Sequence, residues 1–233
     1  MQITSGNSRT VDVTGLLGAK RYGHIDLFVS ELLGGFGDNE LWPECMAPLE
    51  KRAREFNALQ GLPGPEAIPT RVQTWVAPVV MPDVGPDHLQ KLWVVQTAVP
   101  LNPASSVQRV YALSHPFQPT ENMCCAEAPL LITFTTDKCV TGLLGYFVAD
   151  LVKDPTPDLT LSNTYGRETQ GLKEWDPVFF PFQHAITGTF GVRFRRCGNA
   201  QGVWYEWDIE AGGHLEKNSS AKTAMLLDPE PEE

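Results

Sequence analysis

The pattern of apolar and polar positions changes near residue 68 of the chain. Before that point, the run Ile-Asp-Leu-Phe-Val at 25–29 is apolar and partly β-branched, which predicts a buried strand. Residues 41–56 have the spacing of an amphipathic helix. Its apolar positions are Met46, Leu49, Ala53 and Phe56. A strand, a loop and a helix form the unit of α/β sheets, although one or two strands cannot bury a parallel sheet on both faces. The Pro- and Gly-rich segment 61–69 predicts a hinge and a domain boundary.

From about residue 70 onward, short apolar runs are separated by turn residues, which predicts an antiparallel β-sandwich or β-barrel. The alternation at 189–195 fits a strand with one buried and one wet face. Residues 197–202 predict a hairpin loop between the last two runs. The expected strands are 72–80, 91–99, 107–113, 129–135, 141–152, 178–182, 187–196 and 202–210.

These patterns together predict a mainly β fold, in which part of an α/β sheet is followed by an antiparallel barrel or sandwich. The expected domains are residues 1–68 and residues 69–222. The acidic, proline-containing tail 223–233 is expected to be disordered.

Composition excludes several classes of function. The formal net charge of −10 argues against a general nucleic-acid binder and favours basic partners. No apolar run is long enough to span a bilayer. The five cysteines have neither metal-ligand nor disulfide-scaffold spacing, so we expect no metal site and a reducing compartment, the cytoplasm or the nucleus.

Two glutamates, Glu31 and Glu40, bracket a glycine-rich loop directly after the strand predicted at 25–29. The glycines permit a tight reversal that can bring the two carboxylates together. Like charges held close repel one another unless a cation or a shared proton lies between them. A guanidinium suits such a pair best, because it is permanently charged and donates parallel hydrogen bonds to carboxylates. We call residues 31–40 the carboxylate loop.

The loop resembles the "double-E" loop of protein arginine methyltransferases, and its Leu-Leu-Gly and Asp-Asn-Glu sequences are similar to the type II, symmetric-dimethylating branch. The resemblance covers most of residues 25–210 in order and rough spacing. It is carried by residues 30–34, 39–40, 43–45, 77–78, 114–116, 145–147, 179–182, 192–197 and 203–207.

The resemblance implies a domain that binds a methyl donor, followed by a β-barrel, and methyl transfer from S-adenosylmethionine to an arginine side-chain nitrogen, which gives symmetric dimethylarginine. By position, Glu31 and Glu40 would be the catalytic carboxylates. Trp175, Gly35 and Phe36 would contact the substrate arginine, and Gly15 and Leu16 would contact the donor. The implied partners are arginine- and glycine-rich proteins and a second copy of the chain, with no direct nucleic acid and no membrane.

The sequence also departs from the family pattern. The glycine-rich strand-to-helix turn and the acidic residue that hold the donor in the family are not found ahead of the carboxylate loop. We therefore expect Met1 to be an internal start and this chain to be inactive by itself.

Two alternatives remain open at this stage. The chain could be a non-catalytic barrel module, a scaffold or dimerisation surface or an inactive paralogue, because the donor site is incomplete. The two carboxylates could also be a glycosidase pair on a β-sandwich. The first alternative predicts assembly without catalysis, and the second predicts glycoside hydrolysis without a methyl donor.

Other notable side chains have structural interpretations. Trp204, Tyr205 and Trp207 are expected to pack a strand into the core, with Glu206 pointing outward or pairing with Arg193 or Arg195. His115 is expected in a turn, bonded to backbone. The consecutive pair Arg195 and Arg196 is expected to be solvated.

Overall fold

The computed structural model describes residues 24–38, 42–81, 93–94, 103–116, 129–156, 159–164, 175–199, 202–221 and 225–226. Within this part of the chain, strands form most of the structure, as the sequence predicts, and α2 is accompanied by two short parallel strands. No helix in it is long and apolar enough to cross a membrane.

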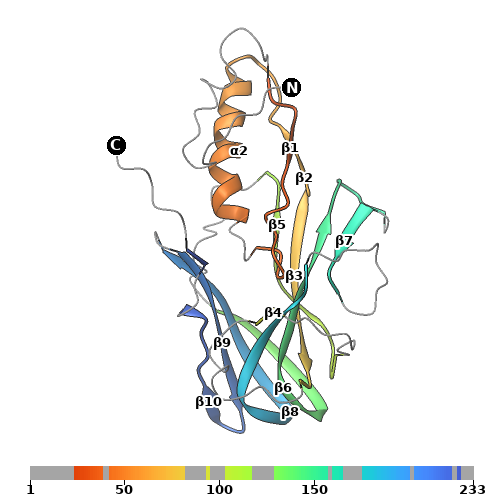
Figure 1. Cartoon of the computed structure of the whole chain (residues 1–233), viewed down its shortest axis with the longest axis vertical. Helices are drawn as coiled ribbons and strands as arrows, with labels where there is room; N and C mark the ends of the chain where they lie inside the picture. The colour runs from red at the N-terminus through yellow and green to blue at the C-terminus, as the bar shows by residue number, and fades with distance from the viewer. Residues whose placement is uncertain are drawn as a thin grey trace.

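The first unit consists of strand β1 (Leu27–Val29), helix α2 (Trp42–Ala58) and strand β2 (Glu66–Ile68). β1 and β2 pair in parallel, and α2 lies beside them at one end of the molecule (Figure 1). Asn57 ties the helix to the start of β1, since its Oδ1 accepts from the Ile25 amide at 3.0 Å and its Nδ2 donates to the Ile25 carbonyl at 2.8 Å. The predicted strand-loop-helix unit is therefore present. The segment predicted as a hinge contains β2. Pairing with β2 satisfies backbone hydrogen-bonding groups of β1 that would otherwise have no partner strand.

The second unit is a nine-stranded sheet with the order β10-β9-β8-β6-β3-β5, to which β4, β7 and β11 pair at the side. Every pairing in it is antiparallel, and the sheet curls at the end of the molecule opposite α2 (Figure 1). The bounds are β3 Arg71–Val79, β4 Trp93–Val94, β5 Gln108–Ser114, β6 Leu130–Asp150, β7 Thr160–Ser162, β8 Val178–Asn199, β9 Gly202–Ala211, β10 His214–Glu216 and β11 Met225–Leu226.

Two pairs of predicted strands are in fact single long strands. The runs at 129–135 and 141–152 belong to β6, and the runs at 178–182 and 187–196 belong to β8. The β6–β8 ladder shifts register between Thr136 and Gly142. The residues that suggested a turn therefore form a β-bulge within β6. The β8–β9 ladder continues to the pair Asn199 and Gly202, so the hairpin loop is shorter than predicted.

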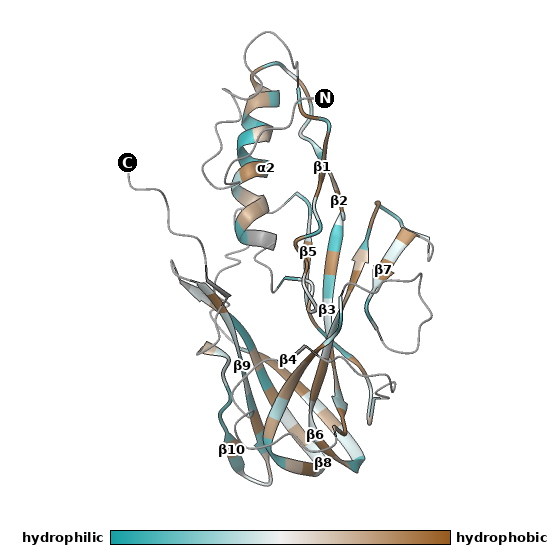
Figure 2. Cartoon of the chain, in the orientation of Figure 1, coloured by the Kyte–Doolittle hydropathy of each residue, from teal (hydrophilic) through white to brown (hydrophobic). Residues whose placement is uncertain are grey.

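Two apolar clusters hold the units together. The larger lies inside the nine-stranded sheet and includes Phe180, Phe194 and Trp207. The smaller joins α2 and the loop after β1 to β3 and β6. Half-buried and buried positions alternate along the first part of β3, and the last four residues of the strand are all buried and apolar (Figure 2). The carboxylate loop contributes Leu33 to the smaller cluster and Phe36 to the larger, so its backbone is fixed by both.

Candidate active site

Glu31 is exposed at the end of β1, where the chain leaves the parallel pair. The Ser30 amide donates to the Ile68 carbonyl at 3.0 Å, which continues the β1–β2 pairing to the residue before Glu31. The Leu33 amide then donates to the Glu31 carbonyl at 2.7 Å. The strand end and this turn hold the backbone of Glu31, while its side chain faces water.

Glycines shape the loop after Glu31. Gly34 and Gly37 have φ angles of 59° and 84°, a region that residues with a Cβ rarely adopt. A Cβ at Gly37 would lie 2.8 Å from both Phe147 Cβ and Val72 Cγ1. The loop therefore reverses sharply and packs its backbone directly against β3 and β6.

Gly35 brings the loop to the segment that contains Trp175. A Cβ at Gly35 would lie 2.2 Å from the carbonyl oxygen of Asp176, the residue after Trp175. On the other side, Asn163 Nδ2 donates to the Gly35 carbonyl at 2.7 Å, while Asn163 Oδ1 accepts from the Phe147 amide at 2.8 Å. Gly35 is thus a contact point between the carboxylate loop and the segment that follows β7.

Trp175 is half-buried beside the same loop. Its ring meets Phe147 edge-on, with centroids 5.8 Å apart and planes at 80°, and it packs against the cluster that contains Leu33. Phe147 also contacts Gly37. The structure therefore brings the segment of Trp175 against the loop at Gly35, although the two are far apart in the sequence.

Phe36 lies in the core. Its ring is fully buried and packs against Tyr111, Phe180, Phe194 and Tyr205, with centroid separations of 5.1 to 6.1 Å. Such edge-to-face packing anchors the loop by apolar burial. The ring of Phe36 therefore stabilises the loop from inside the core.

Glu40, Gly15 and Leu16 lie outside the described residues, so the predicted second carboxylate and the predicted donor contacts stay predictions. Among the described side chains, no group of His, Cys, Asp or Glu could hold a metal ion.

Asp38, near the end of the loop, is completely buried among polar partners. Tyr205 donates its hydroxyl to Asp38 Oδ1 at 2.5 Å, and Tyr111 donates to Oδ2 at 2.6 Å. Arg196 Nε lies 2.5 Å from Oδ2 as an ion pair. Burial raises the pKa of Asp38 above its ordinary value, and Arg196 and the two hydroxyls oppose that shift. Burial, followed by the charge of Asp38, raises the pKa of both tyrosines.

Arg196 joins Asp38 to the first turn of α2. Its Nη1 donates to Glu44 Oε1 at 2.7 Å and its Nη2 donates to Glu44 Oε2 at 2.9 Å, a bidentate pair. Burial alone would lower the pKa of Arg196, but Asp38 and Glu44 outweigh it and raise that pKa. The expectation that Arg196 is solvated is therefore wrong: the residue is 7 % exposed, because two acids from the loop and the helix compensate its charge. We call Asp38, Glu44, Tyr111, Arg196 and Tyr205 the buried polar cluster.

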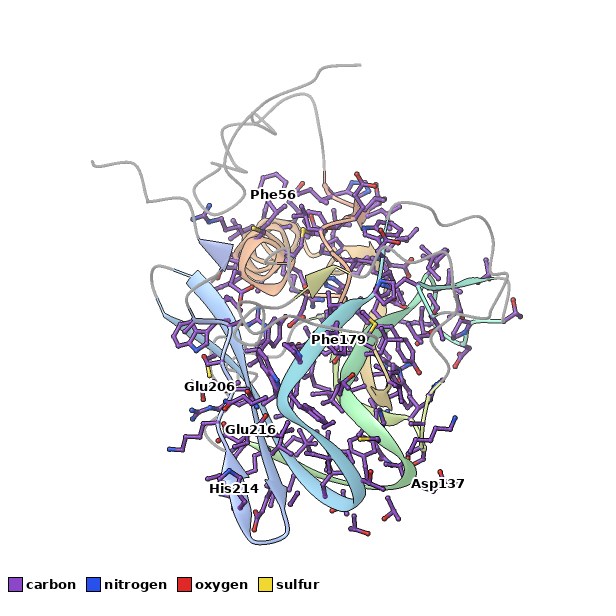
Figure 3. All side chains as sticks on the ribbon, turned by 60° about the horizontal axis from the view of Figure 1, so that its bottom comes forward. Phe56, Asp137, Phe179, Glu206, His214 and Glu216 are labelled. Atoms are coloured by element: carbon purple, nitrogen blue, oxygen red, sulfur yellow. The ribbon has the colours of Figure 1, made fainter. Side chains whose placement is uncertain are left out.

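Arg195, the neighbour of Arg196, points the other way. It forms an ion pair with Glu206 on β9, one of the two pairings expected from the sequence, while Arg193 pairs with Glu210 at 2.9 Å. Figure 3 labels Glu206 towards the edge of the molecule and Phe179 in its interior. Tyr205 and Trp207 are buried, as predicted for core residues, whereas Trp204 is half-buried and its Nε1 donates to Glu206 Oε1 at 3.4 Å.

His115 is more than the turn residue expected from the sequence. Its amide donates to the Thr70 carbonyl at 2.9 Å, and its Nδ1 lies 2.7 Å from Oε2 of the buried Glu50 on α2. Glu50 also accepts from Arg54 Nε at 2.7 Å. This second polar contact fixes α2 to the end of β5.

Sequence reasoning missed Asp38, Glu44 and Tyr111 as members of the site's support. A signal for Arg196 was present, since Phe190, Val192 and Phe194 alternate inward along β8 and the next inward position is Arg196. An arginine on the buried face of a strand requires acidic partners, but the sequence pattern does not identify which acids they are.

The comparisons with known families cover most of the chain. Residues 71–225 match the family described as the PRMT5 oligomerisation domain, and residues 2–59 match the family described as PRMT5 arginine-N-methyltransferase. The chain belongs to the PRMT5 family of protein arginine N-methyltransferases. This membership agrees with the resemblance found in the sequence and favours the methyltransferase interpretation of the carboxylate loop over the glycosidase one.

Curated PRMT5 relatives align with most of this chain. Protein arginine N-methyltransferase 5 from Oryza sativa subsp. indica is 32 % identical over 202 residues, which cover 80 % of this chain and 29 % of the rice protein. The Xenopus laevis protein is 29 % identical over 204 residues, with 79 % and 30 % covered. The chain thus spans about three tenths of the length of these PRMT5 relatives.

Solved structures share the fold at low sequence identity. The crystal structure of PRMT6 superimposes with a TM-score of 0.61 at 14 % identity, covering 88 % of this chain and 71 % of that one. Arabidopsis thaliana protein arginine methyltransferase 10 gives a TM-score of 0.59 at 11 % identity, with 94 % and 73 % covered. At such identities, the likeness establishes a common fold for the PRMT5-type chain and these methyltransferases.

Proposed function

We propose that this chain supplies the arginine-holding part of a protein arginine N-methyltransferase of the PRMT5 type. In this proposal, Glu31 and Glu40 grip the guanidinium of a substrate arginine, and the product is symmetric dimethylarginine. The observation that carries the proposal is the contact at Gly35, which packs the loop beginning with Glu31 against the segment of Trp175.

The proposed chemistry rests on positioning. An arginine nitrogen is a poor nucleophile because its lone pair is delocalised and the group stays protonated. Two carboxylates can fix the rotation of the guanidinium and polarise one terminal nitrogen, so the gain comes from orientation and preorganised charge. S-adenosylmethionine, when bound, supplies the methyl group. A carboxylate of the pair, directly or through water, accepts the proton that the nitrogen loses as its new bond to carbon forms.

Trp175 is proposed to cover the bound arginine. An indole face attracts a guanidinium through the ring quadrupole, and tryptophan is the strongest of the aromatic residues in this interaction. Its contact with Phe147 and the contact of Gly35 with Asp176 would keep the ring beside the loop. Gly35 is proposed to contact the substrate through its backbone, because the Asp176 carbonyl fills the space that a Cβ would occupy.

The proposed donor is S-adenosylmethionine, bound through Gly15 and Leu16. The family match at residues 2–59 supports it, as does the solved Trypanosoma brucei PRMT1 enzyme-prozyme complex with AdoHcy, which has the same fold at 12 % identity and a TM-score of 0.55. The proposed substrates are arginine- and glycine-rich proteins, and the proposed location is the cytoplasm or the nucleus.

Calorimetric titration of peptides into this chain tests the arginine grip. A peptide with a glycine-arginine-glycine sequence should bind, and the same peptide with lysine should bind at least about tenfold more weakly, because lysine cannot form paired hydrogen bonds. Glu31→Gln and Glu40→Gln should each weaken binding of the arginine peptide. Glu55→Gln, on the exposed side of α2, is the matched control and should have no effect. Equal binding of the two peptides would contradict the proposal.

Donor binding is a separate measurement. S-adenosylhomocysteine is titrated into the same chain, with Gly15→Trp as the variant that blocks the proposed contact. Our expectation is weak binding by this chain. A tight complex that Gly15→Trp leaves unchanged would contradict the proposed donor contacts.

A second candidate function is an oligomerisation module without catalysis. It is favoured by the match of residues 71–225 to the family described as an oligomerisation domain. Sedimentation equilibrium distinguishes the candidates when combined with the peptide titration. A stable dimer that does not discriminate arginine from lysine would support the module.

A further inference from the structure

Asp38 and Glu44 flank Glu40 in the sequence, two residues before it and four residues after it. Both bind the same guanidinium, that of Arg196 on β8. The two acids come from different elements, the loop and the first turn of α2. Arg196 therefore fixes the two ends of the segment that carries the second predicted carboxylate.

The surroundings of Arg196 make this attachment rigid. Asp38 is fully buried, and the side chains of Arg196 and Glu44 are 8 % and 5 % exposed. Tyr111 from β5 and Tyr205 from β9 occupy the two oxygens of Asp38. The guanidinium meets Glu44 in a bidentate geometry, which fixes direction as well as distance. A charge removed from this cluster would leave its partners buried and uncompensated.

We infer that Arg196 is a positioning residue: through Asp38 and Glu44 it sets the carboxylate loop in the conformation that receives the substrate guanidinium. The inference rests on the proposed function for its effect on arginine binding. It also makes a claim about the loop alone, namely that the backbone at Gly34, Gly35 and Gly37 depends on Arg196.

A stability loss alone would not distinguish positioning from ordinary structural support, so the test uses two controls. Arg195→Met removes the adjacent arginine, which lies on the outer face of β8 and pairs with Glu206. Phe190→Leu weakens the core at Phe134 and Phe182, away from the buried polar cluster. Arg195→Met controls for the chemistry of the substitution, and Phe190→Leu controls for a loss of stability that arises away from the cluster.

The first readout is the amide spectrum of the ¹⁵N-labelled chain at a temperature where all variants are folded. Arg196→Met should displace the signals of Gly34, Gly35 and Gly37, and Arg196→Lys should restore them in part because it keeps the charge. Arg195→Met and Phe190→Leu should leave these signals in place. Unchanged loop signals in folded Arg196→Met would overturn the inference.

The second readout is affinity for the glycine-arginine-glycine peptide. Arg196→Met should lower it at least about tenfold, with partial recovery in Arg196→Lys and no change in Phe190→Leu. Affinity that follows stability across all variants would overturn the inference. If the unaltered chain does not bind the peptide, the proposed function fails, and the glycine signals still decide the role of Arg196.

A milder variant covers the case in which Arg196→Met does not fold. Tyr205→Phe removes the hydroxyl bound to Asp38 Oδ1 and leaves both ion pairs of Arg196 in place. It should displace the same glycine signals by less. Loop signals identical to those of the unaltered chain would count against the inference.

Discussion

Arg196 on β8 and Glu44 on α2, 152 positions apart in the sequence, form a buried bidentate ion pair. The pair joins the helix of the α/β unit to the large antiparallel sheet. The intact ion pair adds little net free energy of folding, because both charges had to leave water. Removing one partner is costly, because the other charge then stays buried without compensation.

Arg196→Met is expected to reduce the free energy of unfolding by about 3–5 kcal/mol, since Asp38 and Glu44 remain buried without their cation. Arg195→Met is expected to cost no more than about 1 kcal/mol, because its pair with Glu206 is partly exposed. Urea unfolding measures both values. Similar losses for the two variants would contradict the assignment of Arg196 to a buried cluster.

Gly37→Ala is expected to destabilise the chain more than Gly61→Ala. Both residues have positive φ, 84° and 69°, and each substitution costs about 1–2 kcal/mol for that conformation. A Cβ at Gly61 meets nothing within 4 Å, whereas at Gly37 it would lie 2.8 Å from Phe147 and Val72. Overpacking adds about 1–3 kcal/mol at Gly37 only. Thermal unfolding of the two variants gives the difference, and equal melting temperatures would refute the tight packing of the loop.

Trp175→Ala is expected to weaken binding of the arginine peptide while leaving the fold intact. The ring is half-buried and its edge-on contact with Phe147 is worth about 0.5–1.5 kcal/mol. Trp175→Phe should retain part of the affinity, because a phenyl face also attracts a cation. Titration calorimetry gives the affinities, and circular dichroism checks the fold. An Ala variant with unchanged affinity would remove Trp175 from the proposed site.

The pH dependence of stability should carry opposite contributions from two carboxylates. The pKa of Asp38 is raised in the folded chain, chiefly by burial, so the folded state holds a proton that the unfolded state releases. Its contribution to stability therefore falls as pH rises from about 4 through the raised pKa. For Glu206, burial would raise the pKa, but hydrogen bonds from Arg195 lower it overall. Its contribution is present above about pH 4.3 and is lost as pH falls through the lowered pKa.

Urea unfolding between pH 3 and pH 7 separates the two effects. Asp38→Asn should remove a downward slope with rising pH, and Glu206→Gln should remove an upward one. Slopes of the same sign would contradict the environments described for these residues.

Local pattern was sufficient for much of the fold. Helix α2 follows from the spacing of Met46, Leu49 and Ala53, and the strand at 189–195 follows from its alternation, because these signals are set within a few residues. The continuity of β6 and β8 did not follow, since a bulge and a turn contain similar residues and only the partner strand distinguishes them.

The candidate site was predictable where chemistry is carried by short motifs. Glu31 and Gly35 come from the carboxylate loop and Trp175 from the family resemblance, and their roles stay predictions. The structure packs the segment of Trp175 against the loop at Gly35. The buried polar cluster was not predictable in the same way. Its members lie on five elements, and nothing near Asp38 or Glu44 in the sequence indicates a partner as distant as Arg196.

The shared guanidinium of Arg196 has a consequence for protein engineering and for evolution. An exchange of the nine-stranded sheet between relatives at residue 69 would separate Arg196, Tyr111 and Tyr205 from Asp38 and Glu44, although the cut falls between the two expected domains. A chimaera built there would inherit mismatched charges in its interior unless all five positions came from one parent. We expect these five positions to change together during evolution. The predicted domain boundary is therefore visible in the sequence, but the two halves cannot be freely recombined there.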